Sequence, residues 1–309
     1  MKTKFINTII ILLCIITIIE IFLNKLLIFN TISYSLNIWI NSLIPSLFPF
    51  FIISDILINY NITNYIPPII KNIFKKLFNV SDNIITIFFL SILSGFPSSA
   101  RNIKLMLDKK LITPKEATHT LIFTHFSNPI FILGTISILF LHNKTLGIII
   151  LLSHYIPNIL LGIFTRKLNT PSNNKRRKEE RHNFPQILIN SIKKSLDTIL
   201  LIFGILSICL VISSLLINRL NLNSYNSTIL KCLLEITMGL KSLSELNIPN
   251  IYKTIISSMT LSFGGLSIHI QVLSFINEYN ISYKTFFISR IYHSILSGIL
   301  AYILYIIII

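Results

Sequence analysis

The chain has 309 residues, of which 52% are hydrophobic and 12% are charged, and its mean hydropathy is +0.74. A soluble protein of this length carries about 25% charged residues, so the composition excludes a soluble domain and indicates a polytopic membrane protein. The formal net charge of +16 does not indicate a nucleic-acid partner, because the basic residues lie mainly between apolar segments, as in the cytoplasmic loops of membrane proteins.

The sequence also predicts no metal, no cofactor and no catalytic residues. The cysteines are odd in number and form no CxxC pair, so they indicate neither a disulfide framework nor a zinc site. There is no HExxH, GxSxG or P-loop motif, and His119 and His125 are poorly spaced for one metal. An enzyme is therefore not expected; one embedded in the membrane, with His269 or His293 as base, is the weakest alternative.

Apolar runs of spanning length recur from the N-terminus onward. The first, residues 5–23, is not followed by a signal-peptidase site, so we expect a retained membrane anchor. The second run, residues 34–58, contains Pro45 and Pro49, which predict a kinked or broken helix. Asp55 near its end is expected to be solvated, with a carboxylate in a cavity as the alternative.

The segment at residues 67–80 predicts an amphipathic helix in the membrane interface, because lysines and large apolar side chains can take opposite faces. Residues 229–246 carry four charges at regular spacing and are expected to stay in the interface rather than to cross. The other apolar segments are expected at residues 83–108, with a break in SGFPSSA, at 114–141, interrupted at SNP, and at 145–164, 198–216, 252–277 and 283–309.

A hydrophilic linker, residues 165–186, divides the chain into two halves. Its excess of lysine and arginine predicts, by the positive-inside rule, that it faces the cytoplasm. We expect it to be a solvated connector that fixes the topology. The predicted units are an anchor at residues 1–30, a first repeat at 34–164 with a hairpin at 83–109, the linker, and a second repeat at 187–309 with a hairpin at 252–277.

Two apolar segments are interrupted in corresponding places of these halves. Sliding the chain against itself brings Gly95 onto Gly264 and Ser98 onto Ser267. Each copy has an apolar run, a break at small residues, a short helix and a polar turn before a long span. Backbone that leaves a helix inside a membrane needs polar partners or a watery cavity, so paired interruptions indicate a transporter's binding site.

The candidate substrate-binding residues lie at these breaks and in the last span. The half-helices that follow the breaks point their free N–H groups at the site, which favours an anion. Arg101 is expected to sit at depth beside the first break, with snorkelling to an interface as the alternative. Gln271 lies on another helical face from His269, which itself is more often a packing residue than a ligand. The candidates are Ser94, Gly95, Ser98, Ser99, Arg101, Asn128, Gly264, Gly265, Ser267, His269 and Arg290.

Several segments resemble, in the same order, signatures of the YlbJ (SpoVV-type) sporulation integral membrane proteins of the nucleoside-transporter/FeoB gate-domain group. These segments are SLFPFFIISDIL, LSGFPSSARNIKLMLDKKLITPKEA, FTHFSNPIFILGTI, LLEITMGL and LSFGGLSIHIQVLSF. The resemblance implies a fold like that of the concentrative nucleoside transporters: all-α, with about 6–8 transmembrane segments and two re-entrant helical hairpins in inverted repeats. In the first break relatives often have a glycine and a lysine where this chain has Ser99 and Arg101.

The resemblance also implies a role in endospore formation. Members of the family sit in the outer forespore membrane and are implicated in moving dipicolinic acid, a small dicarboxylate, toward the forespore. The expected partners are therefore a small anionic solute and the lipid bilayer, and a homo-oligomer stays open. Two alternatives also stay open: a transporter of nucleoside-like solutes, and a membrane scaffold of a sporulation complex that transports nothing.

Overall fold

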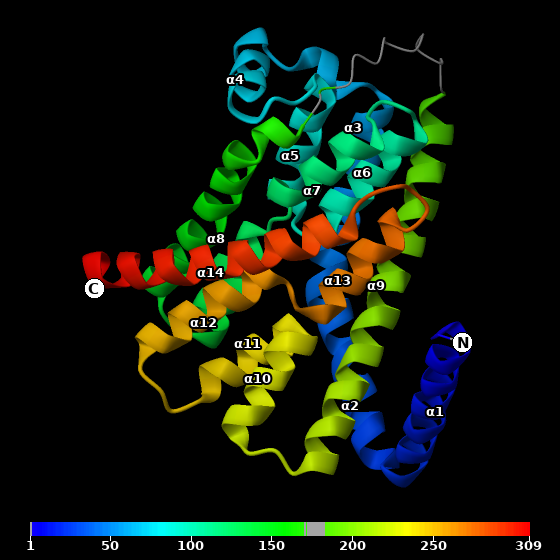
Figure 1. The fold of residues 1–309 in the computed structure, drawn as a ribbon, viewed down its shortest axis with the longest axis vertical. Helices are drawn as coiled ribbons and strands as arrows, with labels where there is room; N and C mark the ends of the chain where they lie inside the picture. The colour runs from blue at the N-terminus through cyan, green and yellow to red at the C-terminus, as the bar shows by residue number, and fades with distance from the viewer. Residues whose placement is uncertain (1, 170, 172–182) are drawn as a thin grey trace.

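All regular elements of the computed structural model, which describes residues 2–169, 171 and 183–309, are helices (Figure 1). Within these residues six helices are long and apolar enough to cross a membrane, and a bent pair of helices would make seven. The prediction of an all-α membrane protein is therefore confirmed. The inverted relation of the two halves stays a prediction, and the basic run at residues 175–181 of the linker lies outside the described residues.

Apart from the stretch between η4 and α9, short connections join the helices. The first half contains α1 (Lys2–Leu23), α2 (Lys25–Ile38), η1 (Trp39–Leu43), α3 (Ile44–Asn59), η2 (Ile62–Tyr65), α4 (Pro68–Phe78), α5 (Asp82–Ser94), α6 (Ser98–Asp108), α7 (Pro114–Phe123), η3 (Phe131–Phe140) and α8 (Lys144–Phe164). The rest contains η4 (Arg166–Leu168), α9 (Phe184–Leu220), α10 (Ser224–Leu234), α11 (Ile236–Glu245), α12 (Asn250–Phe263), α13 (Gly265–Ile276) and α14 (Tyr283–Ile308).

The N-terminal helix α1 lies at the edge of the molecule, and its apolar side chains are exposed all around it (Figure 1). This is the arrangement expected of a lipid-facing anchor. The helix ends at Leu23, the end of the predicted apolar run, and α2 begins at Lys25. Helices α2, η1 and α3 then form one span, Lys25–Asn59, with a π-helical turn just before Pro45. The predicted distortion at the prolines is therefore present.

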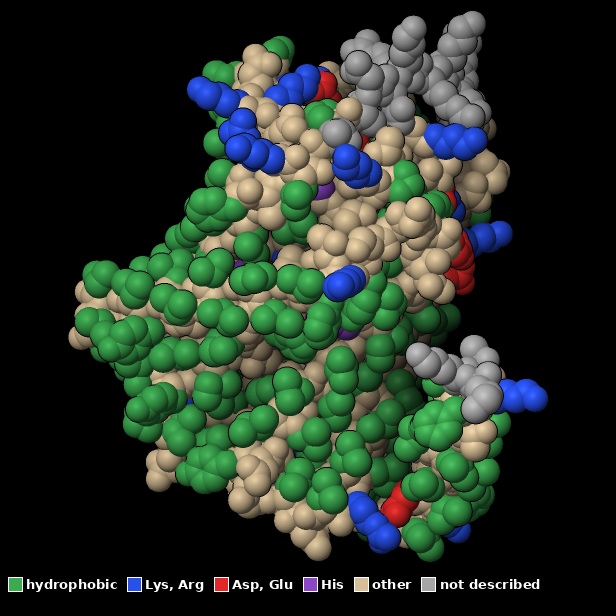
Figure 2. Space-filling view, viewed as in Figure 1, with side chains coloured by type: hydrophobic (Ala, Val, Ile, Leu, Met, Phe, Trp, Pro, Cys, Tyr) green, Lys and Arg blue, Asp and Glu red, His purple; other side chains and the backbone are tan. Residues whose placement is uncertain are grey.

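The short helix α4 confirms the predicted amphipathic segment. Its Phe74 and Phe78 are buried in the protein, while Lys71 and Lys75 reach the Asp82 carboxylate at 3.6 and 3.0 Å. Figure 2 shows lysine and arginine gathered at the end of the molecule that carries α4, and hydrophobic side chains over the face formed by α9, α12 and α14. That division is typical of a protein whose basic end lies in the headgroup region of a bilayer.

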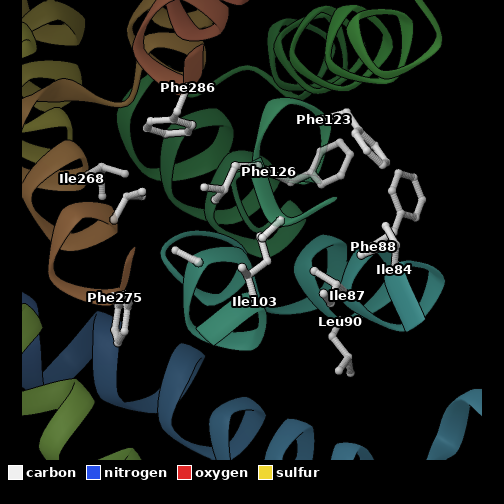
Figure 3. Close-up of a cluster of buried hydrophobic side chains, with 14 of the residues drawn as sticks. Ile84, Ile87, Phe88, Leu90, Ile103, Phe123, Phe126, Ile268, Phe275 and Phe286 are labelled. Atoms are coloured by element: carbon white, nitrogen blue, oxygen red, sulfur yellow. The ribbon is translucent and has the colours of Figure 1, made fainter. Parts of the chain in front are cut away.

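The main hydrophobic core lies where the two halves meet. Side chains from α5, α6, α13, α14 and the segment after α7 converge in it, as Figure 3 shows for Phe88, Ile103, Phe126, Phe275 and Phe286. The pair α5–α6 therefore packs between parts of the chain that are distant in sequence. This packing holds the break between α5 and α6 inside the molecule, away from lipid.

The second half differs from the prediction. Helices α12 and α13 continue across Gly264 as one candidate span, Asn250–Ile276, instead of forming a hairpin at 252–277. The segment at residues 229–246, predicted to be interfacial, belongs to the two short helices α10 and α11, which pack against each other on either side of Glu235. Whether a chain turns back or continues after a break is decided by packing, which small residues in a sequence do not specify.

The order of elements is nevertheless the same in both halves. A packed pair of short helices (α5–α6 and α10–α11) is followed by an interrupted helix (α7–η3 and α12–α13) and then by a long helix (α8 and α14). The break at Gly264 thus corresponds by position to the extended residues 124–128, and the tip at residues 95–97 corresponds to Glu235.

Labelling of single cysteines tests the direction of α12–α13. In a variant whose native cysteines are replaced by alanine, Asn250→Cys and Asn277→Cys should react with an impermeant maleimide from opposite sides of sealed vesicles, because the two residues end one spanning helix. Both cysteines should react after the vesicles are opened with detergent. Reaction of both from the same side would instead show a re-entrant hairpin.

Candidate functional site

A cavity of about 400 Å³ lies where breaks in the described helices meet. The tip at residues 95–97, the extended residues 124–128 and the Glu235 break all contribute to its wall, together with η1, α3, α9 and α13. Its volume is in the range of small-molecule sites in proteins. The polar lining residues are Asn41, Ser42, Ser46, Ser94, Ser127, Asn128, Thr135, Glu235, Thr237 and Gln271.

The wall on the side of the first half depends on Gly95. Its φ angle is +74°, and a Cβ atom on it would lie 2.6 Å from the backbone nitrogen of Asn128. Only glycine allows both this conformation and this approach. Ser94 at the cavity wall donates to the carbonyl of Leu90 at 2.6 Å, and its hydroxyl lies 2.5 Å from that of Ser98. Ser94 thus ties the two helices of the pair together.

Some polar atoms of the cavity wall have no hydrogen-bond partner in the described part of the protein. They are the hydroxyl of Ser127, the Nδ2 amide of Asn128 and the Oε1 oxygen of Gln271, all on side chains that are less than 9% exposed. A buried polar atom left unpaired costs about 1–3 kcal/mol. Water or a solute in the cavity can supply the missing partners of these three atoms, so this wall can bind a polar molecule.

Glu235 is the charged residue of the described cavity wall, and it is 3% exposed. Its backbone is extended, and its carboxylate caps α11 by accepting the N–H groups of Thr237 at 3.1 Å and Met238 at 2.8 Å. The positive end of the helix dipole stabilises a carboxylate in this position. The cap explains how a carboxylate can be buried at this break without a basic partner.

Arg101 and Asp55 form a buried ion pair beside the cavity, not in its wall. Their side chains are 3% and 2% exposed, and Nη1 of Arg101 lies 2.7 Å from Oδ1 of Asp55. Arg101 also donates to the Thr198 and Ser195 hydroxyls and to the carbonyl of Phe51. The prediction of a solvated Asp55 is wrong, because packing of α3 against α6 encloses it. Arg101 does not snorkel; its charge is balanced within the protein.

Arg290 lies in the interior, where it holds the broken end of α7. Its guanidinium donates to the carbonyl of Ile122, to that of His125 at 3.5 Å, and to Oδ1 of Asn158 at 3.1 Å. A further bond of 2.9 Å joins it to Nδ1 of His293. The carbonyls at the end of a helix have no partner within the helix, and Arg290 supplies some of what they lack. Arg290 does not line the cavity.

The break at Gly264 has its own support. Both Gly264 and Gly265 have positive φ angles, and Nε2 of His269 donates to the carbonyl of Phe263 at 3.1 Å. The other ring nitrogen of His269 bonds the Tyr283 hydroxyl at 3.0 Å. His269 is therefore a satisfied packing residue, which was the favoured expectation.

The structure thus divides the predicted candidates. Ser94 and Asn128 line the cavity, and Gly95 permits its wall; the rest lie outside the cavity lining. These other candidates are Ser98, Ser99, Arg101, Gly264, Gly265, Ser267, His269 and Arg290. Sequence reasoning set Gln271 aside and missed Glu235 as a site residue. An acidic residue in the apolar segment LLEITMGL was the signal that could have pointed to Glu235.

Comparison with known proteins gives one family match and one curated relative. The Gate family, described as "Nucleoside recognition", matches residues 40–144, from η1 to the start of α8. The resemblance is confirmed. The chain is 26% identical over 316 residues to the sporulation integral membrane protein YlbJ of Bacillus subtilis (strain 168), covering 90% of this chain and 77% of YlbJ. No solved structure matches the chain. The Gate match includes Ser94 and Asn128 but not Glu235 or Gln271.

Replacement of Arg101 tests whether its role is structural. Arg101→Ala leaves the Asp55 carboxylate buried and unpaired, so we expect it to lower the free energy of unfolding by about 3–5 kcal/mol. The double replacement Asp55→Leu with Arg101→Leu removes both charges. It should lower the free energy of unfolding by less than the sum of the decreases caused by the two single replacements. Thermal unfolding in detergent ranks these variants by stability.

A matched control lies on the same helix. Lys104 pairs with Glu278 in an exposed bridge, so Lys104→Ala should cost only about 0–1 kcal/mol. If the decreases in unfolding free energy caused by replacing Arg101 and Asp55 were additive, the two buried charges would not depend on each other.

Proposed function

We propose that the protein is a transporter that carries a small solute through the cavity between the tip at residues 95–97 and the Glu235 break. The observation that supports this most directly is the convergence of interrupted helices on one space lined by unpaired polar atoms. Helices broken near the middle of a membrane are the usual source of substrate sites in secondary transporters. We propose no catalytic role, since the arrangement offers binding groups around a space rather than a nucleophile and its base.

We further propose that the solute is dipicolinate and that transport serves endospore formation, across the outer forespore membrane. The name of the relative YlbJ, a sporulation protein, supports the cellular role. Phe50, Phe96 and Phe131 in the cavity wall can contact the face of a pyridine ring. Nδ2 of Asn128 can donate a hydrogen bond to one of its carboxylates. On this proposal the linker at residues 165–186 is cytoplasmic.

A nucleoside-like solute is the second candidate, and two observations favour it. The Gate family that matches residues 40–144 is described as "Nucleoside recognition". The described cavity wall carries amide, hydroxyl and carboxylate groups but no lysine or arginine, which suits the hydroxyls and ring nitrogens of an uncharged solute.

Transport by the purified chain in liposomes decides between these candidates. We expect uptake of labelled dipicolinate that excess unlabelled dipicolinate suppresses and excess nucleoside does not. Uptake of nucleoside alone would support the second candidate. Uptake of neither solute, by protein that elutes as a single folded species, would contradict transport and favour a scaffold role.

Gln271 tests whether the cavity is the binding site. Gln271→Leu removes an amide oxygen that has no protein partner, so the fold should be retained while the solute loses a hydrogen bond. A net loss of about 1–1.5 kcal/mol corresponds to roughly a tenfold higher half-saturating concentration in the uptake assay.

The control for this variant is Ser274→Ala on the same helix. The Ser274 hydroxyl bonds the backbone carbonyl of Gln271 and is not part of the cavity wall. The Ser274→Ala replacement should leave the half-saturating concentration of the solute unchanged. An equal effect of both replacements would show that α13 acts through its packing and not through Gln271.

A further inference from the structure

Glu235 presents a buried negative charge to the space that the solute is proposed to occupy. Its two carboxylate oxygens accept backbone N–H groups at the start of α11, and the side chain is 3% exposed. No salt bridge to Glu235 forms within the described residues. Of the two buried arginines there, Arg101 is paired with Asp55, and Arg290 bonds the carbonyls of Ile122 and His125 and the amide of Asn158; neither lines the cavity. An anionic solute in the cavity would therefore meet a carboxylate without a compensating cation in the wall.

The groups around Glu235 do not supply that cation. The helices packed around it, and the positions near it in space, carry these titratable side chains: Tyr34 of α2; Cys209 and the exposed Lys193, Lys194, Asp197 and Arg219 of α9; Tyr225, Lys231 and Cys232 of α10; Lys241 and Glu245 of α11; Tyr252 and Lys253 of α12; and His269 of α13.

Each of the three lysines on α10, α11 and α12 directs its ammonium group to a partner other than Glu235. Lys231 donates to the Ser242 hydroxyl at 2.9 Å, Lys253 donates to the carbonyl of Ser244 at 2.6 Å, and Lys241 lies over the Tyr34 ring. The stretches of wall contributed by η1, α3, α9, η3 and α13 carry no titratable side chain.

A proton is the simplest species that removes the conflict. Two like charges in a space of low dielectric repel each other strongly, and protonation of one of them relieves the repulsion. Addition of a proton to one oxygen of Glu235 neutralises the carboxylate. The O–H group of the resulting acid can donate a hydrogen bond to a carboxylate of the solute. Nothing beyond a proton from water is needed for this step.

We propose that Glu235 is the proton-binding residue of the transport cycle, and that an anionic solute enters the cavity only together with this proton. The inference rests on the proposed transport of dipicolinate. Because binding of proton and solute is linked, each raises the affinity for the other, and a proton gradient can drive accumulation of the solute. The unpaired groups of Gln271, Asn128 and Ser127 belong to the same cavity wall as Glu235.

The test uses the full chain in liposomes, with labelled dipicolinate as the solute in a pH range where it stays a dianion. An acidic outer solution should raise the accumulation ratio of the wild type by up to about tenfold per pH unit. In Glu235→Gln the carboxylate is replaced by a neutral amide. This variant should still exchange labelled for unlabelled dipicolinate, but its accumulation should not respond to the pH gradient.

Glu245→Gln is the matched control, because Glu245 is an exposed acid at the other end of α11 and lies outside the cavity wall. It should behave as the wild type. An unchanged pH response in Glu235→Gln would overturn the inference, and so would a wild type driven by a sodium gradient but not by a pH gradient. Absence of any dipicolinate uptake by the wild type would instead overturn the proposed function, and the inference with it.

A measurement on the wild type covers the case in which Glu235→Gln does not fold. Protein in detergent and weak buffer, with a pH-sensitive dye, should take up protons when dipicolinate is added, and the pH should rise. Binding of dipicolinate without a change in pH would overturn the inference.

Discussion

Backbone groups that leave a helix inside a membrane must find polar partners, and the interior of this protein is organised by that requirement. The carbonyls at the end of α7 are bound by Arg290 and Asn158, and the N–H of Ser127 is bound by Nε2 of His154 at 2.9 Å. His269 does the same for the carbonyl next to Gly264. An unsatisfied group costs several kcal/mol in hydrocarbon, so these side chains make the breaks possible.

The same requirement separates two kinds of buried polar residue. Arg290 and His269 form hydrogen bonds with other groups of the protein, whereas Gln271 and Asn128 each have an unpaired atom at the cavity wall. A polar residue inside a membrane protein is often taken as a ligand to the substrate. Unpaired polar atoms also occur away from the cavity, as at His125 and Ser267, so the proposed binding wall is distinguished by unpaired atoms that also face the cavity.

The buried charges also have partners within the protein. Arg101 is balanced by Asp55, and Glu235 is stabilised by the N-terminal end of α11. The cavity between them therefore has a carboxylate in its wall and a neutralised cation behind it. On the proposed function, the charge of a solute, and not only its shape, decides whether it can enter, and transport is therefore linked to protonation of Glu235.

Composition and apolar periodicity were enough to determine an all-helical membrane protein, the amphipathic helix α4 and the presence of breaks at Gly95, at residues 124–128 and at Gly264. These features depend on local chemistry: run length, proline, glycine and the spacing of lysines. The direction of the chain after each break, the pairing of Arg101 with Asp55 and the place of Glu235 in the cavity wall were decided only in the tertiary structure. Each depends on contacts between residues distant in sequence, which one sequence does not record.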